Sequence, residues 1–288
     1  SIEELLTCDL DLVVIASTNI VHAEQAIASI KAGITVVVDK PMAVNVKETE
    51  LIIQHSKDYG VGASVFFNRK WDSDALTVKK VIDEGILGNI FRLESRFERF
   101  RPDVNSQSWR EQTASELGGG NLLDLQPHLI STAVDWFGPA SLEFSSVRSV
   151  RKVSDDDVLL ILKHENGIDS YLSASAISGA PGPRIRLMGD KGALVIRDLD
   201  PQENLLRAGK HPIRDTWNEE TRSTSFIHQG DTHFEYASEP GNYAIFYAQI
   251  REAISSGAPP ESSLWPTSHT EALVVAQIID EARKVSIR

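Results

Sequence analysis

A lysine ends the most apolar short segment of the sequence. The residues ITVVVDKP occupy positions 34 to 41, so Lys40 follows a run that is typical of a strand buried on both faces. Open α/β sheets bind their ligands at the carboxyl ends of parallel strands, where a partly desolvated ammonium can exchange a proton or hydrogen-bond a substrate hydroxyl. The alternative is that the strand simply ends and Lys40 points into water. Pro41 is either an ordinary strand terminator or the second residue of a cis peptide, which would fix the direction of the lysine.

A carboxylate and an imidazole four residues apart form a second candidate. The segment GGGNLLDLQPHLIST covers positions 118 to 132 and contains Asp124 and His128. Pro127 is compatible with a helix that starts near Asp124, and on such a helix the two side chains share a face. A carboxylate beside an imidazole suits general acid/base chemistry near neutral pH. The alternative is that Asp124 only caps the helix and that His128 is an ordinary surface or core histidine.

The turn after the first apolar strand is a weaker candidate. Ser17, Thr18 and Asn19 precede His22, which opens a predicted helix. Backbone donors at such a helix start meet phosphate or ribose oxygens in many nucleotide-binding domains. Helix capping accounts for the same residues equally well.

Other polar and aromatic residues give less specific signals. Arginines and aromatic residues that occur singly more often pack or extend along the surface than bind a ligand. The candidates for pocket positions among them are Arg101, Trp109, Arg110 and Tyr243. Three histidines in a polar segment lack the spacing of metal ligands, so we expect no metal site. They are His211, His228 and His233.

The first 68 residues alternate between apolar runs and amphipathic segments. The pattern predicts strands at 12–17, 34–40 and 61–68, separated by helices at 22–33 and 45–60. This order of elements is typical of βαβ units in an α/β, Rossmann-type, doubly wound parallel sheet. No G-x-G-x-x-G follows a strand near the start, and no acidic residue lies about 20 positions beyond one. We therefore expect that the sheet is incomplete and that its phosphate-binding units lie upstream of Ser1.

The pattern changes after Asn68. Period-two alternation begins at 89–102 and recurs several times, with helices predicted at 72–88, 121–138, 242–257 and 268–285. We predict an α+β domain with a large, mainly antiparallel sheet, and a division of the chain into 1–68 and 69–288. The segment 200–242 is rich in charge, glycine and proline, which predicts a long irregular excursion near the substrate or a subunit contact.

The composition excludes several classes of function. The formal net charge is −12 without a block of basic residues, so we expect no nucleic-acid or membrane-surface partner. The single cysteine, Cys8, excludes an intramolecular disulfide framework and favours a reducing, cytoplasmic compartment. No apolar stretch approaches the roughly 18 residues of a membrane span. A small-molecule partner is favoured.

Four segments taken together resemble the glucose-fructose oxidoreductase and inositol dehydrogenase family (Gfo/Idh/MocA). They are DLDLVVIASTNIVHAEQAIASIKAGITVVVDKP, FFNRKWD, SWRE and GGGNLLDLQPH. Stretches such as RDLDPQENLLRAGK and PGNYAIFYAQIREAI are similar to the branch that contains NADP-dependent scyllo-inositol dehydrogenases. The resemblance implies a dehydrogenase that uses NAD or NADP and acts on a secondary alcohol of a cyclic polyol or sugar.

The resemblance also implies roles for individual residues. By position in the family motifs, Lys40, Asp124 and His128 form the catalytic set, and the Lys40–Pro41 peptide is expected to be cis. The residues expected to line the cofactor are Ser17, Thr18, Asn19, His22, Asp39, Lys40, Pro41, Asn68, Trp109 and Arg110. Those expected to face the substrate are Arg69, Asp124, His128 and Tyr243.

Two positions depart from the family motifs. Asp39 stands where glutamate is usual and keeps the charge, whereas Gln126 stands where glycine is usual and adds a polar side chain near the site. Two alternatives from the same fold stay open. One is a glycosidase or eliminase that uses NAD transiently, and the other is a cofactor-sensing regulator without catalysis. The broad, one-faced sheet further predicts a homodimer or homotetramer assembled through its open face.

Overall fold

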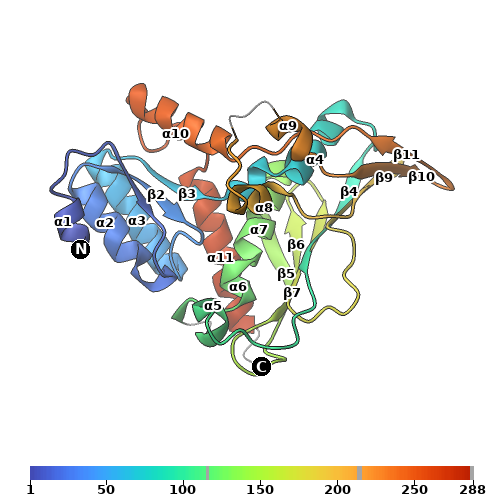
Figure 1. Cartoon of the computed structure of the whole chain (residues 1–288), viewed down its shortest axis with the longest axis horizontal. Helices are drawn as coiled ribbons and strands as arrows, with labels where there is room; N and C mark the ends of the chain where they lie inside the picture. Colours follow the sequence, from blue (N-terminus) through green and yellow to red (C-terminus); the bar gives the residue numbers. More distant parts are fainter. Residues whose placement is uncertain (115–116, 213–215, 286–288) are drawn as a thin grey trace.

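The computed structural model describes residues 1–114, 117–212 and 216–285 of the chain. The apolar runs near the start form a three-stranded parallel sheet in the order β1-β2-β3. The strands are β1 (Leu12–Ile15), β2 (Thr35–Asp39) and β3 (Ala63–Phe66). The predicted parallel, Rossmann-type arrangement of this part of the chain is confirmed (Figure 1).

The helices that precede and connect these strands begin and end where local chemistry requires it. They are α1 (Ile2–Leu5), the 3₁₀ turn η1 (Asn19–Val21), α2 (His22–Lys31) and α3 (Val46–Tyr59). The Asn45 side chain accepts a hydrogen bond from the Glu48 amide and so caps the start of α3. Gly60 adopts a left-handed conformation, with φ of 66°, and ends it.

Strand β2 is buried on both faces, as the run ITVVVDKP predicts. Val36 and Val38 pack in the same core as Ile30 of α2 and Ile52 of α3. Val37 points to the opposite face and packs with apolar residues of α10. A strand with both faces covered has no polar side until it ends, so its first charged side chains appear together at the carboxyl end.

The second sheet has eight strands in the order β11-β10-β9-β8-β4-β7-β6-β5. Its pairs are antiparallel except β4 and β7, which run parallel, so the predicted mainly antiparallel sheet is confirmed. The strands are β4 (Ile90–Glu98), β5 (Ala140–Arg148), β6 (Asp157–His164), β7 (Asp169–Ser175), β8 (Ile185–Gly189), β9 (Gly192–Ile196), β10 (Ser225–Gln229) and β11 (Thr232–Tyr236).

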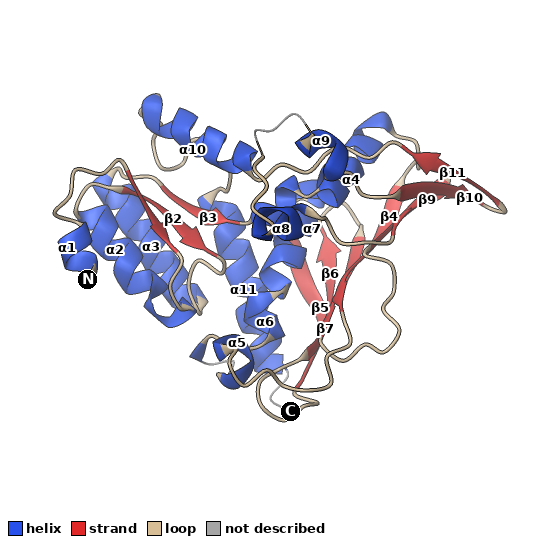
Figure 2. Ribbon diagram, viewed as in Figure 1, coloured by secondary structure: helices blue, strands red, loops and turns tan. Residues whose placement is uncertain are grey.

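Helices cover one face of this sheet. Figure 2 shows α6, α7 and α11 between the two sheets, and contacts join α7 to β4 and β7 and α11 to β5. The remaining helical segments are η2 (Asn68–Trp71), α4 (Ser73–Glu84), α5 (Trp109–Gln112), α6 (Asn121–Asp124), α7 (Gln126–Phe137), α8 (Gln202–Arg207), α9 (Trp217–Glu220), α10 (Ala244–Ser255) and α11 (His269–Val285).

The segment 200–242 is more regular than its composition predicts. It contains α8, α9 and the hairpin of β10 and β11, so the expectation of an irregular excursion is wrong for these residues. The hairpin turns at Gly230, whose φ is 62°. Burial alternates along Ser225, Phe226 and Ile227, but this pattern is too short to stand out from the charged residues around it. Helix α8 does reach the cavity described below.

Among the described residues, no helix combines the length and apolar composition that a membrane crossing requires.

Candidate active site

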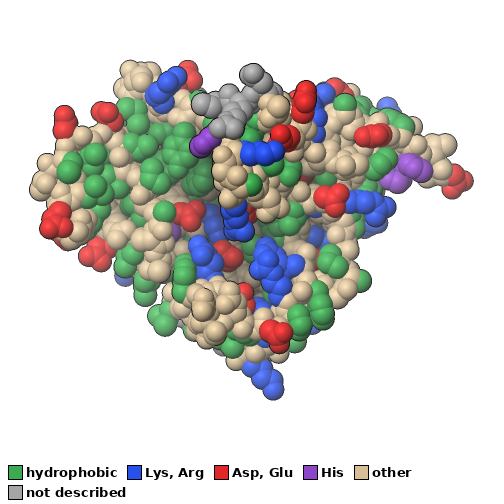
Figure 3. Space-filling model, in the orientation of Figure 1, with side chains coloured by type: hydrophobic (Ala, Val, Ile, Leu, Met, Phe, Trp, Pro, Cys, Tyr) green, Lys and Arg blue, Asp and Glu red, His purple; other side chains and the backbone are tan. Residues whose placement is uncertain are grey.

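A cavity of about 740 Å³ lies where the carboxyl ends of β2 and β3 meet the helices and strands of the second sheet. Figure 3 shows Lys and Arg side chains gathered around the hollow at the centre of this face. The cationic lining residues are Lys40, Arg69, Arg99, Arg101, Arg110, Arg151 and Arg207. The acidic ones are Asp39, Glu111, Asp124, Asp155, Asp200 and Glu203, and His128 and Asn68 also contribute.

Lys40 is the first residue after β2, and the residue is only 9% exposed. Its Nζ donates to the carboxylate Oδ1 and to the main-chain oxygen of Asp124, both at 2.6 Å. The Lys40–Pro41 peptide is cis, which confirms that prediction. The structure therefore brings Lys40 and Asp124, 84 positions apart in the sequence, into direct contact.

Asp124 ends the short helix α6 rather than starting the following helix. The helix is interrupted at Leu125, and α7 then begins at Gln126 with Pro127 in its first turn. One continuous helix starting near Asp124 was expected, and the structure instead has two segments. Asp124 pairs with Lys40 and with Arg110 Nε at 3.1 Å. Burial raises the pKa of the Asp124 carboxyl, but Lys40, Arg110 and Arg99 outweigh burial and hold that pKa below its ordinary value.

His128 lines the cavity from the first turn of α7. Its Nδ1 is buried without a hydrogen-bond partner among the described residues, so the expected orientation of the imidazole by Asp124 is not seen. The ring packs edge-on against Phe97, with centroids 6.3 Å apart. Burial, and then the charges of Lys40, Arg69 and Arg184, hold the pKa of His128 well below its ordinary value. The imidazole is therefore neutral at neutral pH and can accept a proton.

Arg69 projects from η2 into the cavity and is held by three groups. Its guanidinium donates to Asp72, to Glu203 of α8 and to the hydroxyl of Tyr243. The Tyr243 hydroxyl in turn donates to Asp72 at 2.6 Å, and Tyr243 is not among the residues that line the cavity. Its contacts hold Arg69 in place, and its predicted contact with substrate stays a prediction.

The predicted cofactor residues divide into two groups. Asp39, Lys40, Asn68 and Arg110 line the cavity. The others do not: Ser17, Thr18, Asn19, His22, Pro41 and Trp109.

Several residues outside the cavity lining stabilise the loops beside it. His22 Nδ1 lies 2.9 Å from the Pro41 carbonyl oxygen, and Asn19 Nδ2 donates to the Gly118 carbonyl oxygen at 2.8 Å. Ser17 Oγ donates to Gln25. Trp109 stacks beneath the guanidinium of Arg110, whose central carbon lies 4.7 Å from the ring centroid. The cofactor contacts assigned to these residues by resemblance stay predictions.

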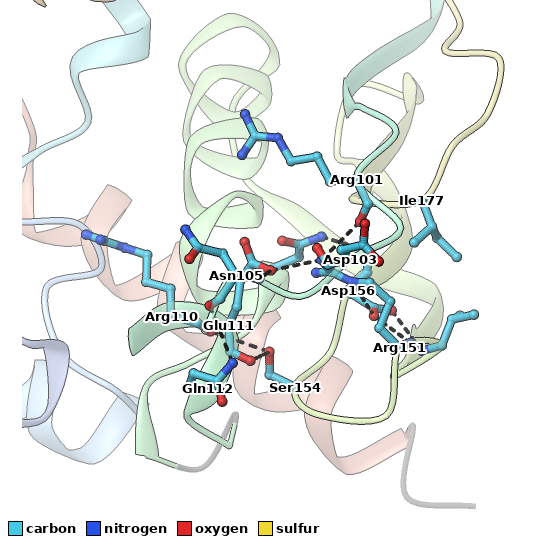
Figure 4. A network of polar contacts seen from close by, with 12 residues as sticks. Arg101, Asp103, Asn105, Arg110, Glu111, Gln112, Arg151, Ser154, Asp156 and Ile177 are labelled. Carbon is cyan, nitrogen blue, oxygen red and sulfur yellow. Dashed lines mark hydrogen bonds and ion pairs between the residues drawn. The ribbon is translucent and has the colours of Figure 1, made fainter. Parts of the chain in front are cut away.

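An arginine that sequence reasoning did not single out organises one wall of the cavity. Figure 4 shows Arg151 at the centre of a network in which it pairs with Glu111 and Asp156 and donates to the main-chain oxygens of Arg101 and Asp103. No local motif marks this role, because Arg101, Asp103 and Glu111 lie 40 to 50 positions earlier in the chain and only Asp156 is near Arg151 in the sequence.

Phe97, Arg99 and Arg101 also line the cavity, and they occupy every second position along β4 and its extension. The alternation is visible in the sequence, which gives Arg101 as a pocket candidate. Among the described residues, the structure brings together no group of three or more His, Cys, Asp or Glu side chains that could hold a metal ion.

Comparisons with known proteins agree with this architecture. Residues 1–67 match a model described as an oxidoreductase family with an NAD-binding Rossmann fold, and residues 75–195 match the GFO/IDH/MocA C-terminal domain. The chain is 33% identical to the uncharacterized oxidoreductase YdgJ of Escherichia coli, over 94% of this chain and 78% of that protein. It is 31% identical to the scyllo-inositol 2-dehydrogenase (NADP(+)) IolW of Bacillus subtilis, over 96% of this chain and 77% of that protein.

A solved structure gives the same picture. The putative oxidoreductase yvaA of Bacillus subtilis superposes with a TM-score of 0.88 at 30% identity, covering 100% of this chain and 82% of that one. With matching models on both sheets and relatives above 30% identity along nearly the whole chain, this protein belongs to the GFO/IDH/MocA family of oxidoreductases, whose Rossmann fold binds NAD.

Proposed function

We propose that this oxidoreductase transfers a hydride between NADP or NAD and a secondary alcohol on the ring of a cyclic polyol or sugar. The meeting of Lys40, Asp124 and His128 in one cavity carries the proposal. The likeness to a protein named as an NADP-dependent scyllo-inositol 2-dehydrogenase supports both the substrate class and NADP as the preferred cofactor.

The residues present fit the nicotinamide end of a dinucleotide. The cavity of about 740 Å³ lies within the range of small-molecule sites and opens at the carboxyl ends of β2 and β3, where such folds bind their ligands. Asn68 supplies a hydrogen-bonding amide at this edge and would hold the nicotinamide end, with Lys40 beside it. A bound nicotinamide supplies the centre that accepts or gives up the hydride.

His128 takes the proton of the substrate hydroxyl in the direction of oxidation. Its neutral imidazole is ready to act as a base at neutral pH, because burial and neighbouring cations disfavour its charged form. A positioned general base of this kind contributes roughly 100- to 10,000-fold to the rate.

Lys40 stabilises the negative charge that develops on the substrate oxygen. Its ammonium carries three donors, of which two engage Asp124, so one remains for the substrate. Asp124, itself fixed by Arg110, keeps the ammonium in one position, and a donor that is already oriented needs no reorganisation during the reaction.

The test uses the protein expressed with any residues that its gene encodes ahead of Ser1. Nicotinamide absorbance is followed with inositols and aldoses in the presence of NADP or NAD. We expect turnover in the wild type and a loss of about 100- to 1,000-fold in kcat for Lys40→Ala, by analogy with removal of one oxyanion donor.

Lys79→Ala provides the matched control, since Lys79 lies on α4 with a side chain 58% exposed. It should leave kcat unchanged. Full activity of Lys40→Ala would overturn the assignment of Lys40. Product formation without a net change in nicotinamide absorbance would point instead to transient use of the cofactor in hydrolysis or elimination.

A further inference from the structure

Two arginines in the cavity lack the carboxylate partners that the other cations there have. Lys40 and Arg110 pair with Asp124, Arg69 and Arg207 pair with Glu203, and Arg151 pairs with Glu111. Among the described residues, neither Arg99 nor Arg101 has a side-chain hydrogen bond or an ion pair, although both line the cavity. In a chain with a formal net charge of −12, unpaired cations concentrated in one cavity need an explanation.

The main chain holds these two arginines in place. The Arg99 amide donates to the Ser175 carbonyl oxygen at 2.9 Å, and the Arg101 amide donates to the Ala176 carbonyl oxygen at 2.6 Å. These bonds extend the pairing of β4 with β7 beyond the strand ends. Because side chains alternate along an extended segment, Arg99 and Arg101 lie on the same side as Phe97, against which His128 packs.

Arg151 contacts Arg101 through the main chain only. Arg151 donates to the main-chain oxygen of Arg101 and so fixes this residue through its backbone. In Figure 4 the Arg101 side chain leaves that network and extends away from it, as does the side chain of Arg110.

The two cations are close enough to affect each other. Burial lowers the pKa of Arg99, and the charge of Arg101 lowers that pKa further, while Asp124 and Glu203 act in the opposite direction. Each guanidinium group is planar and has several donors, and both line the cavity, so together they offer donors of the kind that recognise carboxylate or phosphate.

We propose that Arg99 and Arg101 bind an anionic substituent of the substrate, a carboxylate or a phosphate ester, so that the alcohol oxidised here belongs to an acidic sugar or polyol. This inference rests on the proposed function, since it names the class of substrate for the same site. It distinguishes this protein from a dehydrogenase of neutral polyols.

The anion belongs to the substrate rather than to the cofactor because of where the arginines lie. They extend β4 of the eight-stranded sheet, whereas the NAD-binding family model covers residues 1–67. They line the same wall of the cavity as Phe97, which packs against the imidazole of His128. A substrate held by its anionic group at this wall would present its hydroxyl groups toward His128 and Lys40.

The experiment compares pairs of compounds that differ in the anionic group alone. Glucuronate and a phosphate ester of glucose are each compared with glucose, and an inositol phosphate is compared with inositol. For each pair, KM and kcat are measured with saturating cofactor for the wild type, Arg99→Gln, Arg101→Gln and the double variant. We expect an acidic member to be preferred by the wild type and its KM to rise about 10- to 100-fold in each single variant, the usual effect of losing a charge-assisted hydrogen bond.

The controls separate this effect from general damage. Arg148→Gln removes the same charge from an arginine 63% exposed at the end of β5 and should leave every KM unchanged. Arg101→Lys keeps the positive charge without the planar guanidinium group. Its KM for the acidic member should fall between that of the wild type and that of Arg101→Gln. The KM for the neutral member of each pair should stay within about twofold in all variants.

Three results would overturn the inference. The first is equal KM values for acidic and neutral members in the wild type. The second is an equal loss for both members in the variants, and the third is a change confined to the ratio of NADP to NAD, which would assign the arginines to the cofactor phosphate.

The inference and the proposed function can fail separately. Isothermal titration calorimetry with the same compound pairs measures recognition of the anion without turnover. Absence of turnover with every alcohol would contradict the proposed function, while tighter binding of the acidic members that Arg101→Gln abolishes would still support the anion site. Equal calorimetric affinity for the acidic and neutral members would overturn the inference of an anion site.

Discussion

His128 is an imidazole placed among three cations and almost fully removed from water, with 6% of the residue exposed. Since both effects lower its pKa, it stays neutral through pH 7 and begins to gain a proton only well below the ordinary value of 6.5. We therefore expect kcat/KM for alcohol oxidation to stay level as the pH falls from neutral through 6.5 and to decline only at lower pH. The measurement is a pH profile of kcat/KM with one alcohol substrate.

Replacement of His128 tests which group causes that decline. His128→Asn should lower kcat by roughly 100- to 10,000-fold and remove the acid limb of the profile. His164 is a suitable control, because burial also lowers its pKa while its ring bonds Gly138 and Ser170 away from the cavity. An acid limb that persists in His128→Asn, or disappears in His164→Asn, would contradict this assignment.

For single residues, the sequence predicts which side chains lie in one site better than it predicts which of them contact each other. Lys40, Asp124 and His128 were expected in one site, and all three line one cavity. The contact of Asp124 with Lys40 instead of His128 was not predictable from a spacing of four. It depends on the helix break at Leu125 and on a strand end 84 residues away.

At the scale of elements, the start of α6 determines where Asp124 lies. Gly120 has φ of 82°, a left-handed conformation that glycine adopts readily, and an added Cβ would overlap the Asp155 carboxylate. Asp155 in turn accepts hydrogen bonds from the amides of Asn121 and Leu122 in the first turn of α6. We expect Gly120→Ala to destabilise the protein by about 2–4 kcal/mol and to lower kcat, because the turn that positions Asp124 must shift.

Gly209 provides the control for the conformational part of this cost. Its φ is 77°, and an added Cβ would meet open space. Gly209→Ala should therefore destabilise by only about 1–2 kcal/mol, the cost of a left-handed non-glycine residue, with no effect on kcat. Urea unfolding and steady-state kinetics measure both variants. Equal losses in the two would show that the contact with Asp155 contributes nothing.

Element types followed from the sequence wherever periodicity was long and uninterrupted. The three strands of the parallel sheet and α2 and α3 agree with their predicted positions, since each apolar run or stripe is buried by tertiary packing. The hairpin of β10 and β11 was missed because five-residue strands carry few alternating positions and charge dominated the surrounding composition. The position of β4 between β8 and β7 was also beyond prediction, since strand order depends on contacts distant in the sequence.

At the scale of the whole molecule, α11 fixes the two sheets relative to each other. It packs against α3 and β3 on one side and against α7 and β5 on the other (Figure 1). Lys70, only 8% exposed, joins Glu271 of α11 to Asp135 of α7 at 3.0 and 3.2 Å. The cavity between the sheets therefore depends on the last helix of the chain as well as on the strands that line it.

The face of the large sheet opposite α6, α7 and α11 carries exposed and half-buried apolar side chains in neighbouring strands. Phe144 of β5, 48% exposed, lies opposite Ile161 of β6, which in turn lies opposite Tyr171 of β7. Arg92 stacks on Tyr171, with 5.1 Å between its guanidinium carbon and the ring centroid. A contiguous row of this kind is typical of protein interfaces, where aromatic residues and arginine are enriched. We propose that a second copy of the chain covers this face, giving a homodimer or a homotetramer.

An aspartate at the centre of this row tests the assembly. Wild-type protein is expected to sediment at two or four times its monomer mass, and Ile161→Asp at the monomer mass, because a carboxylate buried between two apolar surfaces costs several kcal/mol. Leu51→Asp, which places the same charge at a position 42% exposed on α3, should leave the mass unchanged. A wild type that sediments as a monomer at micromolar concentration, or an Ile161→Asp variant that keeps the wild-type mass, would rule out this face as the subunit interface.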